Sequence, residues 1–171
     1  GLTYRKKGNN MALRNITELG DEVLRKHCKE VTEITPKILE LLDDMKDTLI
    51  DAGGVGLAAP QVGILRRIFI IDEGAGDDDH KIVEFINPKI VETKGHQEEI
   101  EGCLSIPGKY GVTSRPKTVT VEATDRTGKT FRYTGTDLYG RCLCHENDHL
   151  DGVLYIDNAV RMLDPDEIEE A

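Results

Sequence analysis

The sequence predicts a single α+β domain, and three features of its 171 residues support this. Strand-like segments cluster between two separated helical segments instead of alternating regularly with helices. No internal repeat or linker divides the chain, and its length suits one domain with a substantial core. Hydrophobic residues make up 38% and charged residues 32%, a mixture typical of water-soluble globular proteins.

Residues 1–10 are interpreted as an expression remnant ahead of a natural start at Met11, so that 11–171 form one catalytic domain. The remnant contains three basic residues and no acidic ones, so its removal lowers the formal charge by three, from −10 to −13. An acidic surface argues against a nucleic-acid partner bound through a broad basic patch. No apolar run reaches the roughly 18 residues of a membrane span, and no leader for export opens the chain. The cytoplasm is therefore the expected compartment.

The first helix is expected to begin at Pro36 and to end before Gly53. Thr35 offers a capping hydroxyl, and a proline is favoured at the first helical position. Five apolar side chains then recur along one helical face: Ile38, Leu41, Leu42, Met45 and Leu49. The pattern predicts a helix that buries this face.

Four segments rich in β-branched or aromatic residues are predicted as strands: 67–72, 81–87, 118–123 and 130–133. An acidic loop is expected between the first two. The polar, glycine-containing segment 125–128 predicts that the last two form a hairpin.

The second helix is expected to begin at Thr136 or Asp137 and to end at Gly152. One more short strand is predicted over residues 153–156. The tail beyond Pro165 is acidic, and we expect it to fray.

The second helix contains the pattern H-E-x-x-H, from His145 to His149. Residues four apart lie one turn apart on the same face, so both imidazoles can bind one metal ion. Glu146 is rotated by roughly 100° from His145. Its carboxylate can therefore act as a general base beside the metal rather than as a ligand. The pattern predicts a metal-dependent hydrolase.

A catalytic metal site usually has three protein ligands, and the sequence offers three kinds of candidate for the third. Cys142 lies on the same helix, but three ligands in a line cannot surround an ion well. Glu167 or Glu169 would imitate the glutamate-type zinc peptidases, but both lie in the polar tail. Cys103 lies between glycine and short apolar residues in a separate segment, so it can converge on the histidines. We therefore favour Cys103.

Three blocks of the sequence resemble the bacterial peptide deformylases. They are GVGLAAPQ at 54–61, EGCLS at 101–105 and HENDHL at 145–150. Many metallopeptidases share the third block alone, but all three in this order and spacing are highly specific. The resemblance extends over nearly all of the chain from Met11 to about Asn158.

The resemblance implies a fold in which mostly antiparallel sheets pack around the central metal-binding helix, with a further N-terminal helix. It implies hydrolysis of the N-formyl group from the N-terminal formylmethionine of newly made polypeptides, which releases formate. The partners would thus be N-formylmethionyl nascent polypeptides. The usual metal of the family is Fe²⁺. Sulfur and imidazole ligands also accept Zn²⁺, Ni²⁺ or Co²⁺.

The same resemblance implies a role for each residue of the site. It assigns the metal to Cys103, His145 and His149. It makes Glu146 the general base, and it assigns the developing oxyanion to the side-chain amide of Gln61 and the backbone N–H of Leu104. It implies that the substrate backbone binds to Val55, Gly56 and Gly102 as an added strand. An apolar pocket near Cys142 would take the methionine side chain.

The sequence departs from the family at three places. Cys144 stands where glutamine is common, but it points away from the metal-binding stripe of the helix. Tyr110 lies where some relatives carry an arginine that recognises the substrate. Some relatives end in a basic helix that docks on the ribosome, whereas this tail is acidic. Any ribosome association would therefore be transient and would use another route.

Two other kinds of protein compete with this interpretation. A glutamate-type zinc endopeptidase would use a tail glutamate in place of Cys103. A structural zinc protein would use Cys103, Cys142, His145 and His149, but such a closed site would leave Glu146 without a role.

Overall fold

The computed structural model describes residues 4–7 and 11–170, so the proposed remnant at 1–10 lies partly outside the described residues. The chain has the predicted α+β fold. Its helical elements are η1 (Glu22–Arg25), α1 (Pro36–Ala52), η2 (Ala59–Val62), α2 (Leu138–His149), α3 (Tyr155–Asn158) and α4 (Pro165–Glu170). Its strands are β1 (Tyr4–Lys7), β2 (Met11–Arg14), β3 (Gly56–Ala58), β4 (Ile68–Asp72), β5 (Ile82–Lys94), β6 (Gln97–Cys103), β7 (Ile106–Arg115), β8 (Thr118–Thr124), β9 (Thr130–Thr136) and β10 (Arg161–Met162).

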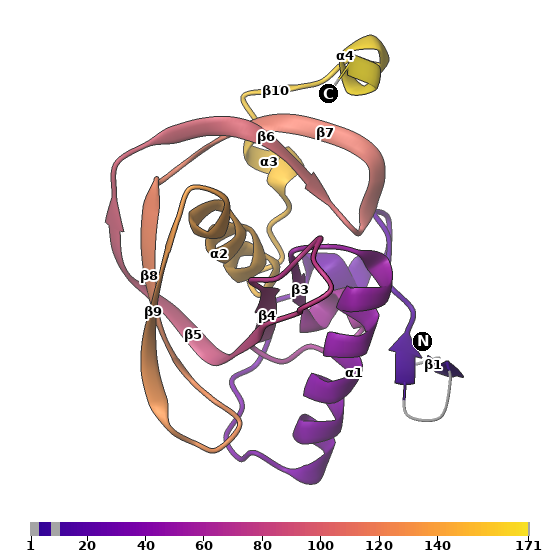
Figure 1. Cartoon of the computed structure of the whole chain (residues 1–171), viewed down its shortest axis with the longest axis vertical. Coiled ribbons are helices and arrows are strands. Elements are labelled where there is room, and N and C mark those ends of the chain that lie inside the picture. The colour runs from indigo at the N-terminus through magenta and orange to yellow at the C-terminus, as the bar shows by residue number, and fades with distance from the viewer. Residues whose placement is uncertain (1–3, 8–10, 171) are drawn as a thin grey trace.

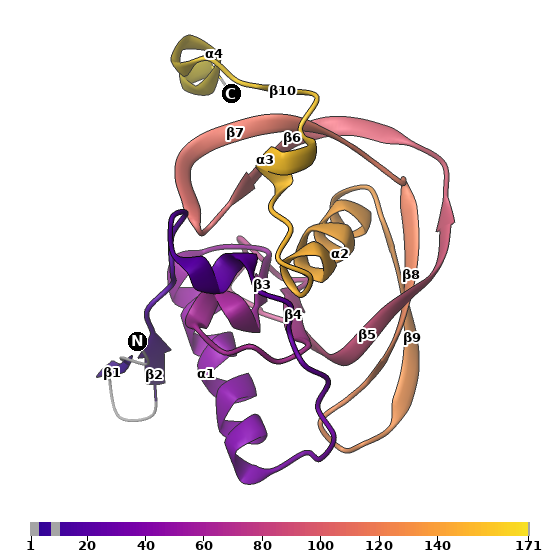
Figure 2. The ribbon, with the colours of Figure 1, turned by 180° about the vertical axis from the view of Figure 1, so that it is seen from behind.

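The strands form three antiparallel sheets, and the two larger ones lie around α2. The largest has the strand order β3-β4-β5-β8-β9, the second has the order β10-β7-β6, and β1 pairs with β2. In both views of the ribbon, β6 and β7 arch over α2, and β3 and β4 lie beneath it (Figures 1 and 2). Within the described residues, no helix is both long and apolar enough to cross a lipid bilayer.

Helix α1 forms where the sequence predicts it. The Thr35 hydroxyl accepts a hydrogen bond from the backbone of Ile38, and Gly53 ends the helix with a φ of 72°. A left-handed residue at this position favours glycine. The expected apolar face is buried against the inner residues of the large sheet, which include Ile68 and Ile70 of β4. The prediction of this helix is confirmed.

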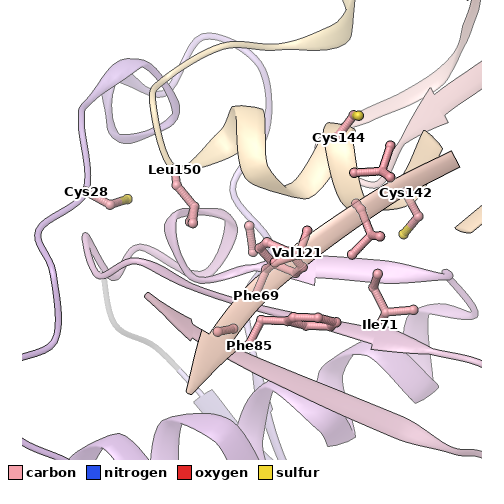
Figure 3. Close-up of a cluster of buried hydrophobic side chains, with 12 residues drawn as sticks. Cys28, Phe69, Ile71, Phe85, Val121, Cys142, Cys144 and Leu150 are labelled. Carbon is pink, nitrogen blue, oxygen red and sulfur yellow. The ribbon is translucent and has the colours of Figure 1, made fainter. Parts of the chain in front are cut away.

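Helix α2 packs on the opposite face of the same sheet. Successive side chains of a strand point to opposite faces, so Phe69 and Ile71 of β4 contact α2 rather than α1. Figure 3 shows α2 lying across these residues, with Phe85 stacked on Phe69 at a centroid distance of 4.7 Å. Strand β4 is buried throughout because a helix covers each of its faces. This packing fixes the position of α2.

The strands were predicted only in part. Those expected at 67–72 and 81–87 are present as β4 and β5, and the hairpin at 118–133 is present as β8 and β9. Strand β5 continues to Lys94, well beyond its expected end. The sequence did not predict β6 and β7, which pair over most of their length.

Two predictions at the C-terminal end were wrong. Residues 153–156 do not form a strand, because the Asp157 carboxylate accepts a hydrogen bond from the backbone of Leu154 and closes the helical turn α3. The tail beyond Pro165 was expected to be frayed, whereas the structure has the helix α4 over Pro165–Glu170. Glu167 stabilises this turn by accepting hydrogen bonds from Arg161 and from the backbone of Asp164.

Candidate metal centre

Two histidines of α2 and one cysteine of β6 form a compact group of candidate metal ligands. His145 and His149 lie one helical turn apart, with their ring centroids 5.0 Å from each other. Cys103 ends β6, and its Sγ lies 3.4 Å from Nε2 of His149. The three ligand atoms, one from each residue, all lie within 4.8 Å of one another. A thiolate and two imidazoles gathered in this way fit one divalent transition metal with an open position.

The structure does not bring the rival ligands to this group. Cys142 lines the neighbouring cleft, but its sulfur is not among the atoms gathered within 4.8 Å. Glu167 forms a salt bridge with Arg161 in the tail, and Glu169 is exposed. The tail projects beyond β10, away from α2 (Figures 1 and 2).

A buried acidic residue of β6 holds the ring of His145 in place. Glu101 lies 2.6 Å from Nδ1 of His145 and forms a two-pronged salt bridge with Arg115. Thr113 donates to the same carboxylate, and Arg115 also binds Asp148. Burial would raise the pKa of Glu101, but the hydrogen bonds from His145 and Arg115 lower it to about 2. The ionised carboxylate thus leaves Nε2 as the nitrogen of His145 that can bind a metal.

Glu146 lies beside this group at the bottom of the cleft. Its side chain is buried, and its Oε1 has no hydrogen-bond partner among the described residues. Burial raises the pKa of Glu146 to about 7, although the charge of His145 acts in the opposite direction. The carboxylate has a free acceptor atom beside the metal-binding side chains.

Gln61 connects the first sequence block to the second. Its Oε1 accepts a hydrogen bond from the backbone N–H of Ala58, at 2.9 Å. Because an N–H requires an acceptor, this bond fixes which end of the amide is nitrogen. Nε2 then donates to the Ser105 hydroxyl at 3.0 Å and lies 3.7 Å from Sγ of Cys103. The amide nitrogen of Gln61 is therefore directed toward the metal-binding group.

The cleft lies between the edges of two different sheets. It has a volume of about 450 Å³, and its walls include Val55, Gly56, Gly102 and Leu104 together with Glu146. β3 is an edge strand of the large sheet, and β6 is an edge strand of the second. Unpaired strand edges offer backbone N–H and C=O groups to an extended peptide. The residues expected to bind a substrate backbone thus line one cleft.

Gly56 is also required by the packing of α2. A Cβ atom at this position would lie 2.7 Å from both Sγ of Cys142 and Oε2 of Glu146. At Gly102, a Cβ would lie 2.8 Å from the ring of Tyr110. The sequence suggested that these glycines admit the substrate backbone, and the structure adds that they let α2 and β7 approach.

Cys144 and Tyr110, two positions at which the sequence departs from the family pattern, have different surroundings. Cys144 is a buried member of the cluster of α2 and the large sheet, and in Figure 3 its sulfur points away from Phe69 and Phe85, to the other side of α2 from the sulfur of Cys142. Tyr110 lines the mouth of the cleft and is 39% exposed.

Sequence reasoning missed three residues that support the metal-binding group. Glu101 was part of a recognised block, and its position two residues before Cys103 on one strand could have placed both on the same face. Arg115 and Tyr155, whose ring stacks on His145 at 6.0 Å, come from segments with no local pattern. Only tertiary structure brings these two to α2.

Comparisons with known proteins identify the family of this chain. The family model for polypeptide deformylase matches residues 13–164. A peptide deformylase of Acetivibrio thermocellus is 52% identical over 159 residues, which cover 93% of this chain and 91% of that relative.

Solved structures show the same fold. A peptide deformylase from Legionella pneumophila is 43% identical, with a TM-score of 0.81 over 92% of this chain and 90% of that chain. One from Synechococcus elongatus, in complex with actinonin, is 40% identical, with a TM-score of 0.82 over 92% and 85%. This chain therefore belongs to the polypeptide deformylase family.

Proposed function

We propose that the chain removes the N-formyl group from newly synthesised polypeptides at the cleft beside α2. Membership of the deformylase family makes it a hydrolase of N-terminal processing in protein biosynthesis. The observation that supports this cleft as the active site is the meeting of Cys103, His145 and His149 with the buried carboxylate of Glu146. The glutamate-type peptidase and the structural zinc protein would need ligands that lie elsewhere.

The family is one of metallohydrolases, and Cys103, His145 and His149 are the residues proposed to hold one divalent metal. Fe²⁺ is the proposed metal, and Zn²⁺, Ni²⁺ or Co²⁺ can take its place. When bound, the metal supplies a Lewis acid that polarises the formyl carbonyl and lowers the pKa of water. Exposure to air would test the choice of iron. Activity should decay in air, and Co²⁺ or Ni²⁺ should slow the decay, because ferrous iron and a thiolate are both open to oxidation.

The residues of the chain have complementary tasks in the proposed reaction. Glu146 accepts a proton from the attacking water and later passes it to the leaving amine. The C–O bond of formate forms, the C–N bond of the formamide breaks, and the peptide leaves with a free amino group. The Gln61 amide and the Leu104 backbone N–H donate hydrogen bonds to the developing oxyanion. An amide suits this position because it donates without adding charge.

The substrate peptide is proposed to lie extended between the two strand edges. Backbone groups of Val55 and Gly56 on one side and of Gly102 on the other would pair with it. The methionine side chain would occupy the apolar part of the cleft near Cys142. The partners are then N-formylmethionyl nascent polypeptides in the cytoplasm. Any contact with the ribosome is transient and uses a surface other than the acidic tail.

The direct test is formate release from a formyl-Met peptide by anaerobically prepared protein whose metal content is measured. Turnover that follows the metal content supports the proposal, and metal-loaded protein that releases no formate contradicts it. A pair of variants separates the peptidase alternative. We expect Cys103→Ala to lose its metal and Glu169→Ala to keep it, whereas a glutamate-type peptidase would behave in the opposite way. Actinonin, which the Synechococcus elongatus relative binds, should compete with the peptide.

A further inference from the structure

The mouth of the cleft carries two cationic side chains, although the protein as a whole is acidic. Arg141 of α2 and Lys109 of β7 both line the cleft of a chain whose formal charge is −10. Arg141 is partly buried and lies one helical turn before His145, and Lys109 is exposed. The lining of the cleft thus has as many cationic as acidic side chains, Glu101 and Glu146 being the acidic ones, although the whole molecule is acidic.

The guanidinium of Arg141 is held by a neutral group. Its Nη1 donates to Oε1 of Gln97 at 2.8 Å. The amide nitrogen of Gln97 is itself bound to the carbonyl oxygens of Pro116 and Asp137, at 2.9 and 3.1 Å. Gln97 thus has a fixed orientation and presents only its oxygen to the arginine. This contact positions the guanidinium without neutralising its charge.

The two carboxylates that line the cleft together with Arg141 have other roles. Glu101 is bound by Arg115 and His145, and Glu146 lies at the bottom. Asp137 is four residues before Arg141 on the chain, and its backbone oxygen accepts the helical hydrogen bond from the backbone N–H of Arg141 at 3.0 Å. An arginine has five N–H donors and stays charged at all relevant pH values. Arg141 can therefore bind an anion that enters with the substrate.

We propose that Arg141 is a specificity-determining residue, which favours formylated peptides with a carboxylate side chain at the second or third position. The inference rests on the proposed function, because it needs a formylated peptide in the cleft. Four helical residues rise about 6 Å, and an extended peptide advances about 3.3–3.6 Å per residue. The helical rise between Arg141 and His145 therefore matches the length of about two residues of an extended peptide.

Lys109 strengthens the positive potential but cannot fix a partner as well as Arg141 does. Its ammonium is exposed and flexible, so solvent and salt screen it. Arg141 is partly buried and already oriented, so a carboxylate that reaches it gains a directed, charge-assisted hydrogen bond. Arg141 is therefore expected to dominate the preference.

The experiment compares matched peptides that differ only in charge. Formyl-Met-Glu-Ser-amide is paired with formyl-Met-Gln-Ser-amide, and formyl-Met-Ser-Glu-amide with formyl-Met-Ser-Gln-amide. The C-terminal amide removes the other carboxylate of the peptide. We expect kcat/KM of the metal-loaded enzyme to be about fivefold higher for the Glu peptide of at least one pair. The difference should lie mostly in KM. It should shrink in 0.5 M salt, because salt screens the attraction between charges and the Debye length falls to about 3 Å as the ionic strength approaches 1 M.

Variants separate Arg141 from the general charge of the protein. Arg141→Gln should bring the Glu-to-Gln ratio to about 1, and Arg141→Glu should favour a Lys peptide over the Glu peptide. Arg132→Gln is the matched control, because Arg132 is exposed on β9 and paired with Glu122. It should keep the wild-type ratio.

Three outcomes would overturn the inference. The first is equal kcat/KM of the wild-type enzyme for the Glu and Gln peptides in both pairs. The second is a Glu-to-Gln ratio in Arg141→Gln that is the same as in the wild type. Failure of the metal-loaded enzyme to hydrolyse any formyl peptide would overturn the proposed function and this inference together. Hydrolysis of all peptides at equal rates would overturn the inference alone.

Discussion

The two long helices, α1 and α2, bury their side chains for different purposes. The buried face of α1 is mainly apolar, and a fully buried leucine such as Leu42 contributes about 1.5–3 kcal/mol through the hydrophobic effect. Helix α2 buries His145, Glu146 and His149 instead. All three buried side-chain N or O atoms without a partner in the described part of the chain belong to α2: Glu146 Oε1, Asn147 Oδ1 and His149 Nδ1.

This difference indicates that the buried polar residues of α2 serve the chemistry of the site rather than the stability of the fold. A buried polar atom without a hydrogen bond costs free energy, so α2 would be a poor choice for a purely structural helix. The large sheet and the β6–β7 arch hold it in place (Figure 1). Substitutions on α1 should therefore change stability alone, whereas substitutions around the polar face of α2 should change activity or metal binding.

The largest effect is expected for Glu146→Gln, which should reduce kcat by about 10²–10⁴-fold. Glutamine has nearly the same shape but cannot accept the proton of water. Because the change also removes a buried carboxyl group, the free energy of unfolding should not fall. Steady-state kinetics, metal analysis and urea denaturation on one preparation check this, and near-normal turnover would refute the role of Glu146.

On α1, Leu42→Ala should lower the free energy of unfolding by about 2–5 kcal/mol, because it leaves a cavity in a fully buried site. The activity per folded molecule should stay within twofold of the wild type (about 0.4 kcal/mol). Denaturant unfolding and kinetics in the absence of denaturant measure the two quantities. A large loss of kcat in fully folded Leu42→Ala would show that α1 and α2 are not independent.

Glu101→Gln should weaken metal binding by about 10–100-fold, because Glu101 orients the ring of His145. Excess metal should restore much of the activity, a rescue that simple unfolding would not show. Glu122→Gln is the control, since Glu122 forms an exposed pair with Arg132 on the other sheet. Chelator competition provides the affinities, and equal affinities in both variants would contradict the positioning role.

The smallest effects compare two glycines, Gly53 at the C-terminal end of α1 and Gly56 of β3, which packs against α2. Gly56→Ala should cost about 1–3 kcal/mol and lower activity, because its Cβ would displace Glu146 and Cys142. Gly53→Ala should cost only about 1 kcal/mol, through its positive φ, and leave activity unchanged. Thermal melts and kcat/KM values distinguish the two. Similar activity in both variants would mean that the contact at Gly56 does not position Glu146.

Local patterns predicted α1 and the metal-binding pattern of α2, because caps and helical spacing act over a few residues. They did not predict β6, where Glu98, Glu99 and Glu101 interrupt any apolar alternation. The strand is stable because it pairs with β7, and because Arg115 neutralises the buried Glu101. Both interactions come from tertiary structure.

The residues of the site were likewise predicted only where a local pattern marks them. The recognised blocks contain the three proposed metal ligands together with Gln61 and Glu146. Arg115 and Tyr155 have no local pattern around them, and only the sheet register and the turn at α3 bring them to His145. The wrong prediction of a strand at 153–156 has the same origin, because the carboxylate of Asp157 closes the helical turn α3 by accepting a hydrogen bond from the backbone of Leu154.

The central claim is that the polar face of α2 forms the active site of a deformylase. Its most direct test is the ratio of kcat/KM for formyl-Met and acetyl-Met peptides, measured on one anaerobic preparation of known metal content. A site closely walled by the backbone near Gly56 and Leu104 would leave little space for an acetyl methyl, so the account predicts strong rejection of the acetyl peptide. Formyl-norleucine and formyl-leucine peptides should lose activity only gradually, by about 1–3 kcal/mol per methylene. Equal rates on the acetyl and formyl peptides, or efficient internal cleavage of an unblocked peptide, would contradict the account.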